Sequence, residues 1–455
     1  MSAHQAPGAE VEHGFSLANS LGLDPVWIAG SILFIVYAVL VTEKINRAIL
    51  AMLGAALMVI LGVMNQREAV AGVDFNTLAL LIGMMVIVAI TSKSGLFQYV
   101  AIKSAKVVKA DPIGILLMLT VITAVFSALL DNVTTVLLIA PVTLLITDSL
   151  KVKVFPYFFA EIFASNIGGT ATLIGDPPNI IIGSKAELSF NDFLIHTMPI
   201  ALFCMFVLVA IVFFLYRKNL HSTPECKALI MQFNEKEAIT DTLLMKKALV
   251  VLALVLVGFT AGHSLGIQPG TSALSGAALL MLLAYGSKDA EEQSESIHHI
   301  FGEVEWITIF FFAGLFIIVA GVESTGLLEV IGEKLMAFTQ GDLEKTAFVI
   351  LWVSGILSAL LDNIPFVATM IPMIQSTADT FGGAEAIRPL WWALALGACF
   401  GGNGSLIGAS ANLTVAAYAE KAKQPIGFVY FFVRAFPLML LTLLLAHIYM
   451  WIRYF

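Results

Sequence analysis

Charged residues and cysteines are scarce in this chain of 455 residues: Asp, Glu, Lys and Arg make up 12%, and there are three cysteines. A soluble domain carries about 25% charged residues, so this shortage excludes an ordinary soluble protein. Cys204, Cys226 and Cys399 are widely separated, which excludes a disulfide framework and the paired spacing of a zinc site. A Ser/His/Asp constellation and a histidine-rich cluster are also lacking. We therefore expect no enzymatic activity, cofactor, metal site or nucleic-acid partner.

Apolar sequence is abundant instead. Hydrophobic residues make up 59% of the chain, and the mean hydropathy is +0.93. Apolar stretches long enough to cross a bilayer as helices recur along the whole length after residue 24. The polar N-terminal segment 1–24 lacks the basic stretch of a cleavable signal peptide. We expect an all-α, multi-pass protein embedded in the lipid bilayer.

A duplicated motif divides the chain in two. Residues 127–132 and 358–363 both read Ser-Ala-Leu-Leu-Asp-Asn, and the register that aligns Asp131 with Asp362 also aligns Gly83 with Gly314 and Pro141 with Pro372. A slightly shifted register, which aligns Gly168 with Gly401, matches the Gly-rich stretches 168–175 and 401–408. Chance similarity between apolar segments would not place Asp-Asn, Gly-Gly and Pro in matching positions. The duplication predicts two repeats, and transporters built this way favour an inverted arrangement.

The connection between the repeats carries several lysines and an arginine, so the positive-inside rule places it in the cytoplasm. We therefore divide the chain into a first repeat (25–216), a cytoplasmic linker (217–245) and a second repeat (246–455). Four apolar pieces are too short to span and are interrupted by Gly, Pro, Asn or Asp, which is typical of re-entrant or broken helices. These pieces are 133–147, 170–183, 364–376 and 405–418.

The duplicated motif places a carboxylate deep in each repeat. Asp131-Asn132 and Asp362-Asn363 each precede a short helix, and Asp and Asn are good N-cap residues. Capping explains the residue types but leaves a buried charge, and neither motif contains Lys or Arg. Acids at membrane depth usually serve ion or proton pathways, so we favour reversible protonation or cation binding at these tips, with Thr134 beside the first tip.

The Gly-rich stretches supply the second candidate element. Glycines allow backbone to approach an ion closely, Pro177-Pro178 ends a helix, and unwound carbonyls can coordinate a cation. The second copy replaces Asp176 by Ala409, so we place the coupling ion near Asp176 and the substrate nearer the neutral copy. The candidate binding residues are Asn166, Gly168, Gly169, Thr170, Thr172, Gly175, Asp176 and Asn179 in the first repeat, and Gly402, Asn403, Ser405, Gly408, Ser410 and Asn412 in the second.

Glu161 lies one helical turn before Ser165-Asn166, whereas the matching position in the second repeat is Leu394. Glu161 is either a member of a proton relay or an interfacial residue near the end of its span. With Asp131, Asp176 and Asp362 it completes the set of predicted proton-coupling residues. Cys399 is interpreted as a small buried apolar residue.

These motifs resemble those of the ion transporter superfamily, above all the branch with the melanosomal P protein and bacterial permeases for arsenite efflux or sodium/proton antiport. The resemblance covers almost the whole chain. It implies a scaffold that forms a homodimer, a transport domain with two re-entrant hairpins and two broken helices, and an elevator-type movement. More distantly the chain resembles the divalent-anion/sodium symporters, whose hairpin tips carry Ser-Asn-Thr. Here Asp131 and Asp362 replace that Ser, and a negative tip repels a dianion and favours cation or proton chemistry.

The first functional hypothesis is proton-coupled efflux of a small inorganic solute, such as arsenite or antimonite, across a bacterial inner membrane. A cytoplasmic ATPase subunit would be a partner in that case. Sodium/proton antiport is the first alternative, and sodium-coupled symport of an anion of the dicarboxylate kind is the second. A channel belongs to another class and would not need two duplicated broken helices.

Overall fold

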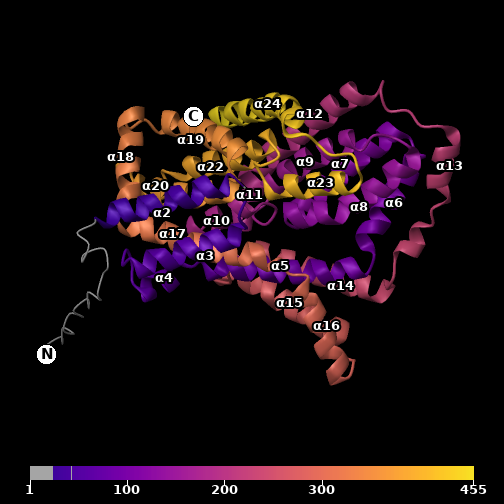
Figure 1. Cartoon of the computed structure of the whole chain (residues 1–455), viewed down its shortest axis with the longest axis horizontal. Coiled ribbons are helices and arrows are strands. Elements are labelled where there is room, and N and C mark those ends of the chain that lie inside the picture. The colour runs from indigo at the N-terminus through magenta and orange to yellow at the C-terminus, as the bar shows by residue number, and fades with distance from the viewer. Residues whose placement is uncertain (1–23, 43) are drawn as a thin grey trace. The chain divides into compact units, whose positions relative to one another are not determined.

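The helices of the first repeat follow one another with short connections, and Figure 1 labels them as in the text. They are α2 (Pro25–Leu40), α3 (Arg47–Ile60), α4 (Gln66–Gly72), α5 (Phe75–Lys93), α6 (Leu96–Val107), α7 (Pro112–Leu129), α8 (Asn132–Leu150), α9 (Phe155–Thr170), α10 (Pro177–Lys185), α11 (Phe190–His196) and α12 (Met198–Tyr216). The linker forms α13 (Pro224–Gln232) and η1 (Glu235–Ala238).

The second repeat has a similar order of elements. Its helices are α14 (Thr242–Gly262), η2 (His263–Leu265), α15 (Pro269–Tyr285), α16 (Ala290–Gly302), α17 (Trp306–Ser324), α18 (Leu327–Thr339), α19 (Leu343–Leu360), α20 (Asn363–Ser376), α21 (Ala378–Phe381), α22 (Arg388–Gly401), η3 (Gly402–Gly404), α23 (Ser410–Lys421) and α24 (Phe428–Tyr454).

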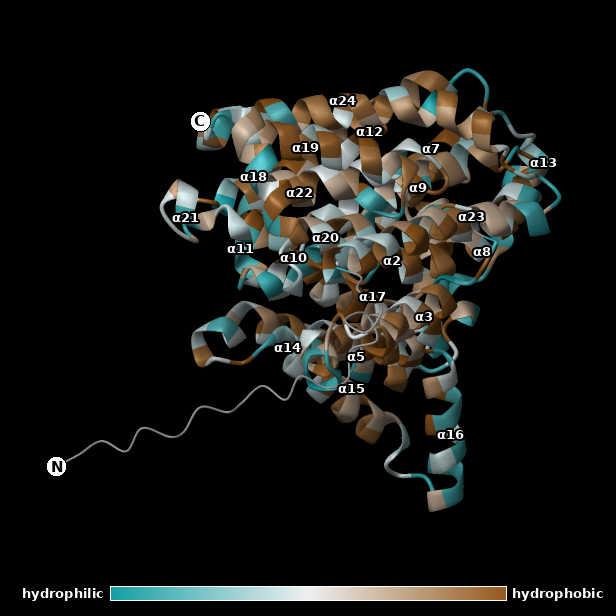
Figure 2. Ribbon diagram, turned by 60° about the vertical axis from the view of Figure 1, so that its left-hand side comes forward, coloured by the Kyte–Doolittle hydropathy of each residue, from teal (hydrophilic) through white to brown (hydrophobic). Residues whose placement is uncertain are grey.

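The computed structural model describes residues 24–42 and 44–455, so the predicted segment 1–24 lies outside it except for Asp24. These residues form helices and no strand. Within the described ranges, eight helices are long and apolar enough to cross a membrane. In Figure 2 the ribbon of α12, α19 and α24 is mostly hydrophobic, whereas α13 and α16 are largely hydrophilic. The prediction of an all-helical, multi-pass membrane protein is confirmed.

The duplication extends to whole helices. α5 and α17 both have 19 residues, α7 and α19 both have 18, and the register that aligns Asp131 with Asp362 also aligns the first residues of each pair. The register that aligns Gly168 with Gly401 also aligns the first residue of α9 with that of α22, and the first residue of α10 with that of α23. Equal spacing of helix starts and breaks means that the same local signals end and restart the chain in both repeats.

The chain divides into two compact units that do not coincide with the repeats. One comprises residues 1–73 and 310–330, and the other residues 74–309 and 331–455. Within the smaller unit, α3 packs so closely on α17 that a Cβ added at Gly314 would lie 2.6 Å from the carbonyl carbon of Ala51. The larger unit contains the same crossing between α5 and α15, where a Cβ at Gly83 would lie 2.6 Å from the carbonyl carbon of Ala273. Each of these equivalent crossings therefore joins one helix of the first repeat to one helix of the second.

Elements of the two repeats pack against one another inside the larger unit. α8 contacts α23, α9 contacts α22, and α10 contacts α20. Figure 1 shows α7, α8, α9 and α23 side by side, although α23 comes from the other repeat. Neither repeat can bury its apolar faces alone, because each supplies surfaces that fit the other repeat.

The first hairpin, α7 and α8, is re-entrant. Both of its ends contact the linker: Lys227 Nζ lies 3.3 Å from Asp111 Oδ1 before α7, and Ser222 Oγ donates to the Leu150 carbonyl at the end of α8 over 2.8 Å. Its tip contacts the end of α9 and the break between α9 and α10. α8 has 19 residues and continues through Pro141, so it is longer than the predicted piece 133–147. Helices in membranes tolerate an internal proline because neighbouring groups satisfy the freed carbonyl.

The second hairpin, α19 and α20, enters from the opposite end. Gln375 Nε2 near the end of α20 donates to the Lys185 carbonyl at the end of α10 over 3.2 Å. At the other end of the broken helix, the Val154 N–H donates to Oε1 of Gln424, which follows α23, over 3.2 Å. The two hairpins thus approach the breaks from opposite sides, as the predicted inverted repeats require.

Candidate ion- and substrate-binding site

The break in the first repeat separates α9 from α10 at residues 171–176. Pro177 and Pro178 occupy the first turn of α10, where their missing N–H groups leave no hydrogen bond unmade. The two chain segments at the break approach so closely that a Cβ at Gly169 would lie 2.5 Å from the carbonyl oxygen of Gly175. A Cβ at Gly175 would lie 2.5 Å from the Ser127 carbonyl of the hairpin. Glycine is required here because any side chain would separate the backbones.

Asn179 holds this break together. Its side chain is fully buried, and Nδ2 donates to the carbonyls of Gly169 and Thr170 over 3.3 Å each and to that of Thr172 over 2.9 Å. These carbonyls lie where α9 ends, and the helix itself leaves such groups without regular partners. The Thr172 hydroxyl in turn donates to the Ala128 carbonyl over 2.6 Å, which ties the break to the hairpin.

Asn412 does the same for the break between α22 and α23. Its Nδ2 donates to the carbonyls of Gly402 and Ser405, over 2.7 and 2.8 Å. A Cβ at Gly408 would lie 2.9 Å from the Ser358 carbonyl. These contacts are made by residues equivalent to those of the first break, so the pseudo-symmetry holds for individual hydrogen bonds.

Asp176 lies where the two hairpin tips meet. It is fully buried, and its Oδ1 accepts from Asn132 Nδ2 over 3.1 Å and from Asn363 Nδ2 over 3.5 Å. Oδ2 is buried and has no hydrogen-bond partner. Asp176 precedes α10, yet its side chain accepts no capping bond. The two equivalent tip amides therefore bind one carboxylate that only the first repeat has.

Asn166 connects the repeats. Its Oδ1 accepts from Asn132 over 3.3 Å, and its Nδ2 donates to the side-chain oxygens of Asn403 and Asn412 over 3.1 Å each. The side chain is fully buried. One amide thus joins the first tip, the first broken helix and the second broken helix into a single polar network.

Cys399 occupies the place in the second repeat that Asn166 has in the first. Its thiol donates to Asn179 Oδ1 over 3.4 Å, the counterpart of the bond from Asn166 to Asn412. Cys399 was interpreted from the sequence as apolar packing and was not among the predicted site residues. The register that aligns Gly168 with Gly401 also aligns Asn166 with Cys399, and this is the signal that would have found it.

The tip acids cap the helices that follow them. The Thr134 N–H donates to Asp131 Oδ1 over 2.8 Å, and the Thr134 hydroxyl donates to Oδ2. Asp362 accepts from the Ile364 N–H over 3.3 Å and from Ser410 Oγ over 3.2 Å. The side chain of Asp362 thereby contacts the start of α23, whereas these hydrogen bonds of Asp131 stay at the start of its own helix.

The remaining predicted residues shape the breaks rather than contribute open polar atoms. The Thr170 hydroxyl donates to the Asn166 carbonyl over 2.7 Å, and Ser405 Oγ accepts from the Ile407 N–H over 3.1 Å. A Cβ at Gly168 would lie 2.3 Å from the Ala124 carbonyl oxygen, so this glycine lets α9 touch α7.

Three buried side-chain atoms in the network have no hydrogen-bond partner: Asp176 Oδ2, Asn132 Oδ1 and Asn403 Nδ2. Two are oxygen acceptors, which suit a proton or a hard cation, and one is an amide donor. Lys and Arg side chains of the described ranges are not bonded to Asp176, so its charge has no fixed counter-ion. The same part of the chain contains no group of three or more His, Cys, Asp or Glu residues that could hold a metal ion.

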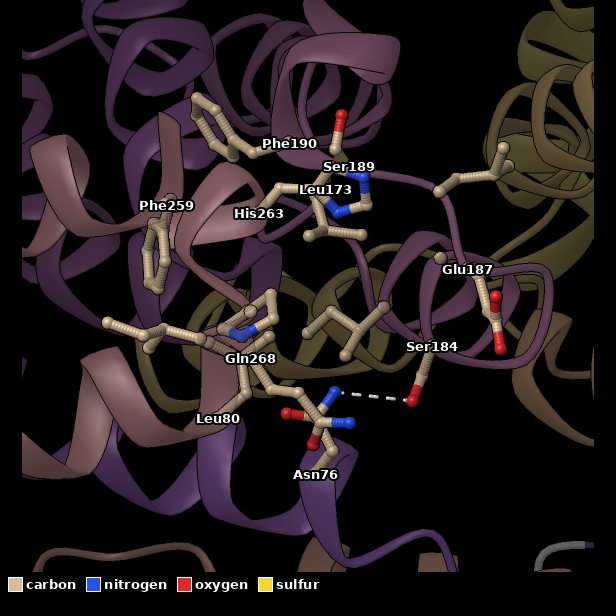
Figure 3. Close-up of a pocket in the computed structure, with 16 residues that line it drawn as sticks. Asn76, Leu80, Leu173, Ser184, Glu187, Ser189, Phe190, Phe259, His263 and Gln268 are labelled. Atoms are coloured by element: carbon tan, nitrogen blue, oxygen red, sulfur yellow. Dashed lines mark hydrogen bonds between the residues drawn. The ribbon is translucent and has the colours of Figure 1, made fainter. Parts of the chain in front are cut away.

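A cavity of about 300 Å³ lies at the far end of α10 and includes Leu173 of the first break in its lining. Figure 3 shows Asn76 Nδ2 donating to Ser184 Oγ over 3.2 Å on one side, with Phe190, Phe259 and His263 on the other. The cavity therefore reaches the first break at Leu173.

Inverted repeats, two re-entrant hairpins and two broken helices around buried acids define a membrane transporter. The chain belongs to the citrate transporter family, CitMHS, which matches residues 37–397. It is 41% identical over 432 residues to an uncharacterized transporter of Mycobacterium bovis, covering 94% of this chain and 98% of the relative. It is 42% identical over 431 residues to a 46 kDa membrane protein of Mycobacterium leprae, with the same coverage.

The resemblance to the P protein is confirmed. The human P protein is 34% identical over 511 residues, which cover 93% of this chain and 60% of that protein. Among solved structures, the YdaH transporter of Alcanivorax borkumensis matches with a TM-score of 0.57 and 11% identity, over 94% of this chain and 98% of that one. This last similarity concerns the fold alone.

Proposed function

We propose that the protein is a proton-coupled secondary transporter that exports a small inorganic solute of the arsenite or antimonite type across a bacterial inner membrane. Asp176 is the coupling site. The observation that carries the proposal is the convergence of Asn132 and Asn363, one from each hairpin tip, on this buried carboxylate. The mycobacterial relatives support a bacterial inner membrane.

The coupling follows from the surroundings of Asp176. An ionised carboxylate without a counter-ion is expensive inside a protein, so it must take up a proton or a cation, or be exposed to water. The unpartnered Oδ2 is the atom that would receive it. Protonation removes the charge that the two tip amides stabilise, and thereby favours a different arrangement of the tips.

The solute would occupy the polar atoms beside Asp176. Arsenite at neutral pH is an uncharged hydroxide whose O–H groups both donate and accept hydrogen bonds. Asn132 Oδ1 and Asn403 Nδ2 are an acceptor and a donor without partners, and both are buried. A neutral solute avoids repulsion by Asp176. Movement of the hairpins and broken helices as an elevator-type body within a homodimer belongs to the same proposal and rests on the resemblance of the motifs to the ion transporter superfamily.

Citrate is the second candidate, favoured by the description of the family. A citrate anion would bring negative charge beside Asp176, to which no Lys or Arg of the described ranges is bonded, so it would have to enter together with cations. Sodium/proton antiport is the third candidate, supported by the two open oxygen atoms. The first two candidates differ in their coupling. Because citrate must enter with cations, its transport would depend on a co-transported cation, whereas transport of a neutral hydroxide would depend on protons alone.

The test is a transport screen with purified protein in proteoliposomes that contain a pH-sensitive dye. Arsenite, antimonite, Na⁺, Li⁺ and citrate are added in turn. We expect arsenite or antimonite to drive proton movement, and Asp176→Asn to abolish it. Asp379→Asn, an exposed acid on α21, is the matched control and should leave the rate unchanged. Proton movement at the wild-type rate in Asp176→Asn would contradict the coupling role, and a response to citrate or Na⁺ alone would replace the proposed solute.

A further inference from the structure

A second buried acid lies where α8 packs against α9, an interface that we call the α8–α9 seam. Glu161 is 1% exposed, so it is buried inside the protein rather than interfacial. Its Oε1 accepts a hydrogen bond of 2.5 Å from Thr143 Oγ1, and its Oε2 is buried without a partner. One hydroxyl is a weak substitute for water around an ionised carboxylate. Oε2 is therefore free to bind a proton, and protonation would remove the unfavourable buried charge.

Polar groups continue along the seam in both directions. Towards the linker, the Thr147 hydroxyl donates to the Thr143 carbonyl over 2.8 Å. Towards the site, Ser165, one helical turn after Glu161, donates to the Asn132 carbonyl over 3.1 Å. The Asn132 amide bonds to Asp176, and the Thr135 hydroxyl on α8 is buried without a partner. The row runs from the coupling site towards the end of α8 that contacts the linker.

The second repeat packs the same seam without polar groups. The two registers place Ile374 opposite Thr143 and Leu394 opposite Glu161, and both are buried. The counterparts of Thr135, Thr147 and Ser165 are Phe366, Ala378 and Ala398. The fold therefore does not need polar side chains at these positions. Burying an acid with an unsatisfied oxygen is unfavourable, so its presence in one repeat requires a function.

We propose that Glu161 is a second proton-binding site, and that the α8–α9 seam carries protons between Asp176 and the linker end of the protein. A proton entering from the linker end forms an O–H bond at Glu161 Oε2. When the proton moves on, the O–H bond at Glu161 breaks and Glu161 becomes a carboxylate. The proton then forms an O–H bond with the carboxylate of Asp176, so that only O–H bonds are made and broken. This inference rests on the proposed coupling role of Asp176.

Other titratable groups do not take over this role. α7, which packs on α9, has no titratable side chain. On α9 itself, the Tyr157 hydroxyl donates to the Pro112 carbonyl over 2.8 Å. None of the titratable or charged groups on the other helices packed against α9 is hydrogen-bonded to Glu161. These groups are Asp148 on α8, Cys204 and Tyr216 on α12, Arg388 and Cys399 on α22, and Tyr418, Glu420 and Lys421 on α23.

The first test replaces Thr143 and Glu161 by the apolar residue types found at the equivalent positions of the second repeat. Because Ile374 and Leu394 already pack at the equivalent positions, Thr143→Ile combined with Glu161→Leu should fold with the thermal stability of the wild type. In proteoliposomes we expect solute exchange without a pH gradient to persist, and solute-driven proton movement to be lost. Thr120→Val, which removes a buried hydroxyl of α7 outside the seam, is the matched control and should keep both activities. Wild-type proton movement in the double variant would overturn the inference while leaving the role of Asp176 intact.

The second test does not depend on transport. Infrared spectra of the purified protein show the carbonyl stretch of protonated carboxylic acids. Subtracting the spectrum of Glu161→Gln isolates the band of Glu161, and Thr143→Val should shift it because the hydrogen bond to Oε1 is removed. We expect this band to appear and disappear reversibly as the pH is changed while the protein stays folded. A band that never changes, or no band at any pH, would overturn the inference even if the transported solute proves to be another one.

Discussion

The chemistry of the site is concentrated in the first repeat. The first repeat has Asp176, Asn166 and Glu161. The equivalent positions of the second repeat are Ala409, Cys399 and Leu394. The tip amides, in contrast, are present in both repeats and donate to the same Asp176 oxygen. A symmetric scaffold thus holds an asymmetric set of titratable groups. In the proposed mechanism this asymmetry separates the coupling ion from the solute, because only the first repeat has an acid at the position of Asp176.

Asn179 provides a prediction about stability. Asn179→Leu removes a donor shared by three buried carbonyls, and leaving buried polar groups unsatisfied costs about 1–3 kcal/mol. We expect a lower midpoint of thermal unfolding in detergent. Asn191→Leu is the matched control, since Asn191 is exposed and bonds one carbonyl, that of Thr260. Equal shifts for the two variants would mean that the clamp at the first break does not stabilise the protein.

Each broken helix is positioned by contact with its hairpin. A Cβ at Gly168 would lie 2.3 Å from the Ala124 carbonyl oxygen on α7, and a Cβ at Gly401 would lie 2.4 Å from the Gly355 carbonyl oxygen on α19. These contacts join backbone to backbone, so neither partner can move aside as a flexible side chain would. The close crossings fix the height of each break relative to its hairpin tip. They explain why both tips reach the same carboxylate.

Gly168→Ala tests this arrangement. The added methyl group would push α9 away from α7, and overpacking of this kind costs about 1–3 kcal/mol. We expect a lower unfolding temperature and a marked loss of transport, because the Asn132 amide would no longer reach Asp176. The control is Gly302→Ala at the end of α16, where an added Cβ meets nothing within 4 Å. Unchanged transport in Gly168→Ala would show that the tip and the break need not be held together.

The linker is attached to the first repeat by ion pairs as well as by the chain. Lys106 Nζ on α6 lies 2.5 Å from Glu235 Oε2 on η1, and Lys227 on α13 pairs with Asp111. The Thr240 N–H also donates to the Ser94 carbonyl over 3.1 Å. The linker therefore lies against the ends of α5, α6 and α7. Through Ser222 and Leu150 it also contacts the end of the seam where we place proton entry.

Docking of the linker should depend on pH. The hydrogen bond from Lys106 holds the pKa of Glu235 below its usual value. A carboxyl whose pKa is lowered in the docked state stabilises that state above the usual glutamate pKa, and the stabilisation is lost as the pH falls through the lowered value. We expect faster hydrogen exchange of the η1 amides at acid pH, after correction for the intrinsic rates. Glu235→Gln should remove this dependence and Glu237→Gln, a change of the other acid of η1, should keep it, whereas a dependence that survives Glu235→Gln would place its origin elsewhere.

The compact units of the whole molecule do not follow its repeats. The repeats follow from the duplicated sequence, whose two registers also align the starts of the equivalent helices and the two breaks. The division at residues 73–74, 309–310 and 330–331 was not visible in the sequence. It depends on which apolar faces pack together, and these faces come from both repeats. Apolar composition alone does not distinguish one partner helix from another.

The membrane environment, the duplication, the two tips and the two breaks could all be predicted from the sequence. These features rest on local signals: apolar length, Pro and Gly at helix ends, and Asp-Asn caps. Which polar groups meet depends on the packing of the folded chain. Asn363 reaches Asp176 across 187 positions and Asn166 reaches Asn412 across 246, because helices of opposite repeats interdigitate. The burial of Glu161 and the thiol contact of Cys399 have the same origin, since the surroundings of a side chain depend on neighbours that local spacing does not encode.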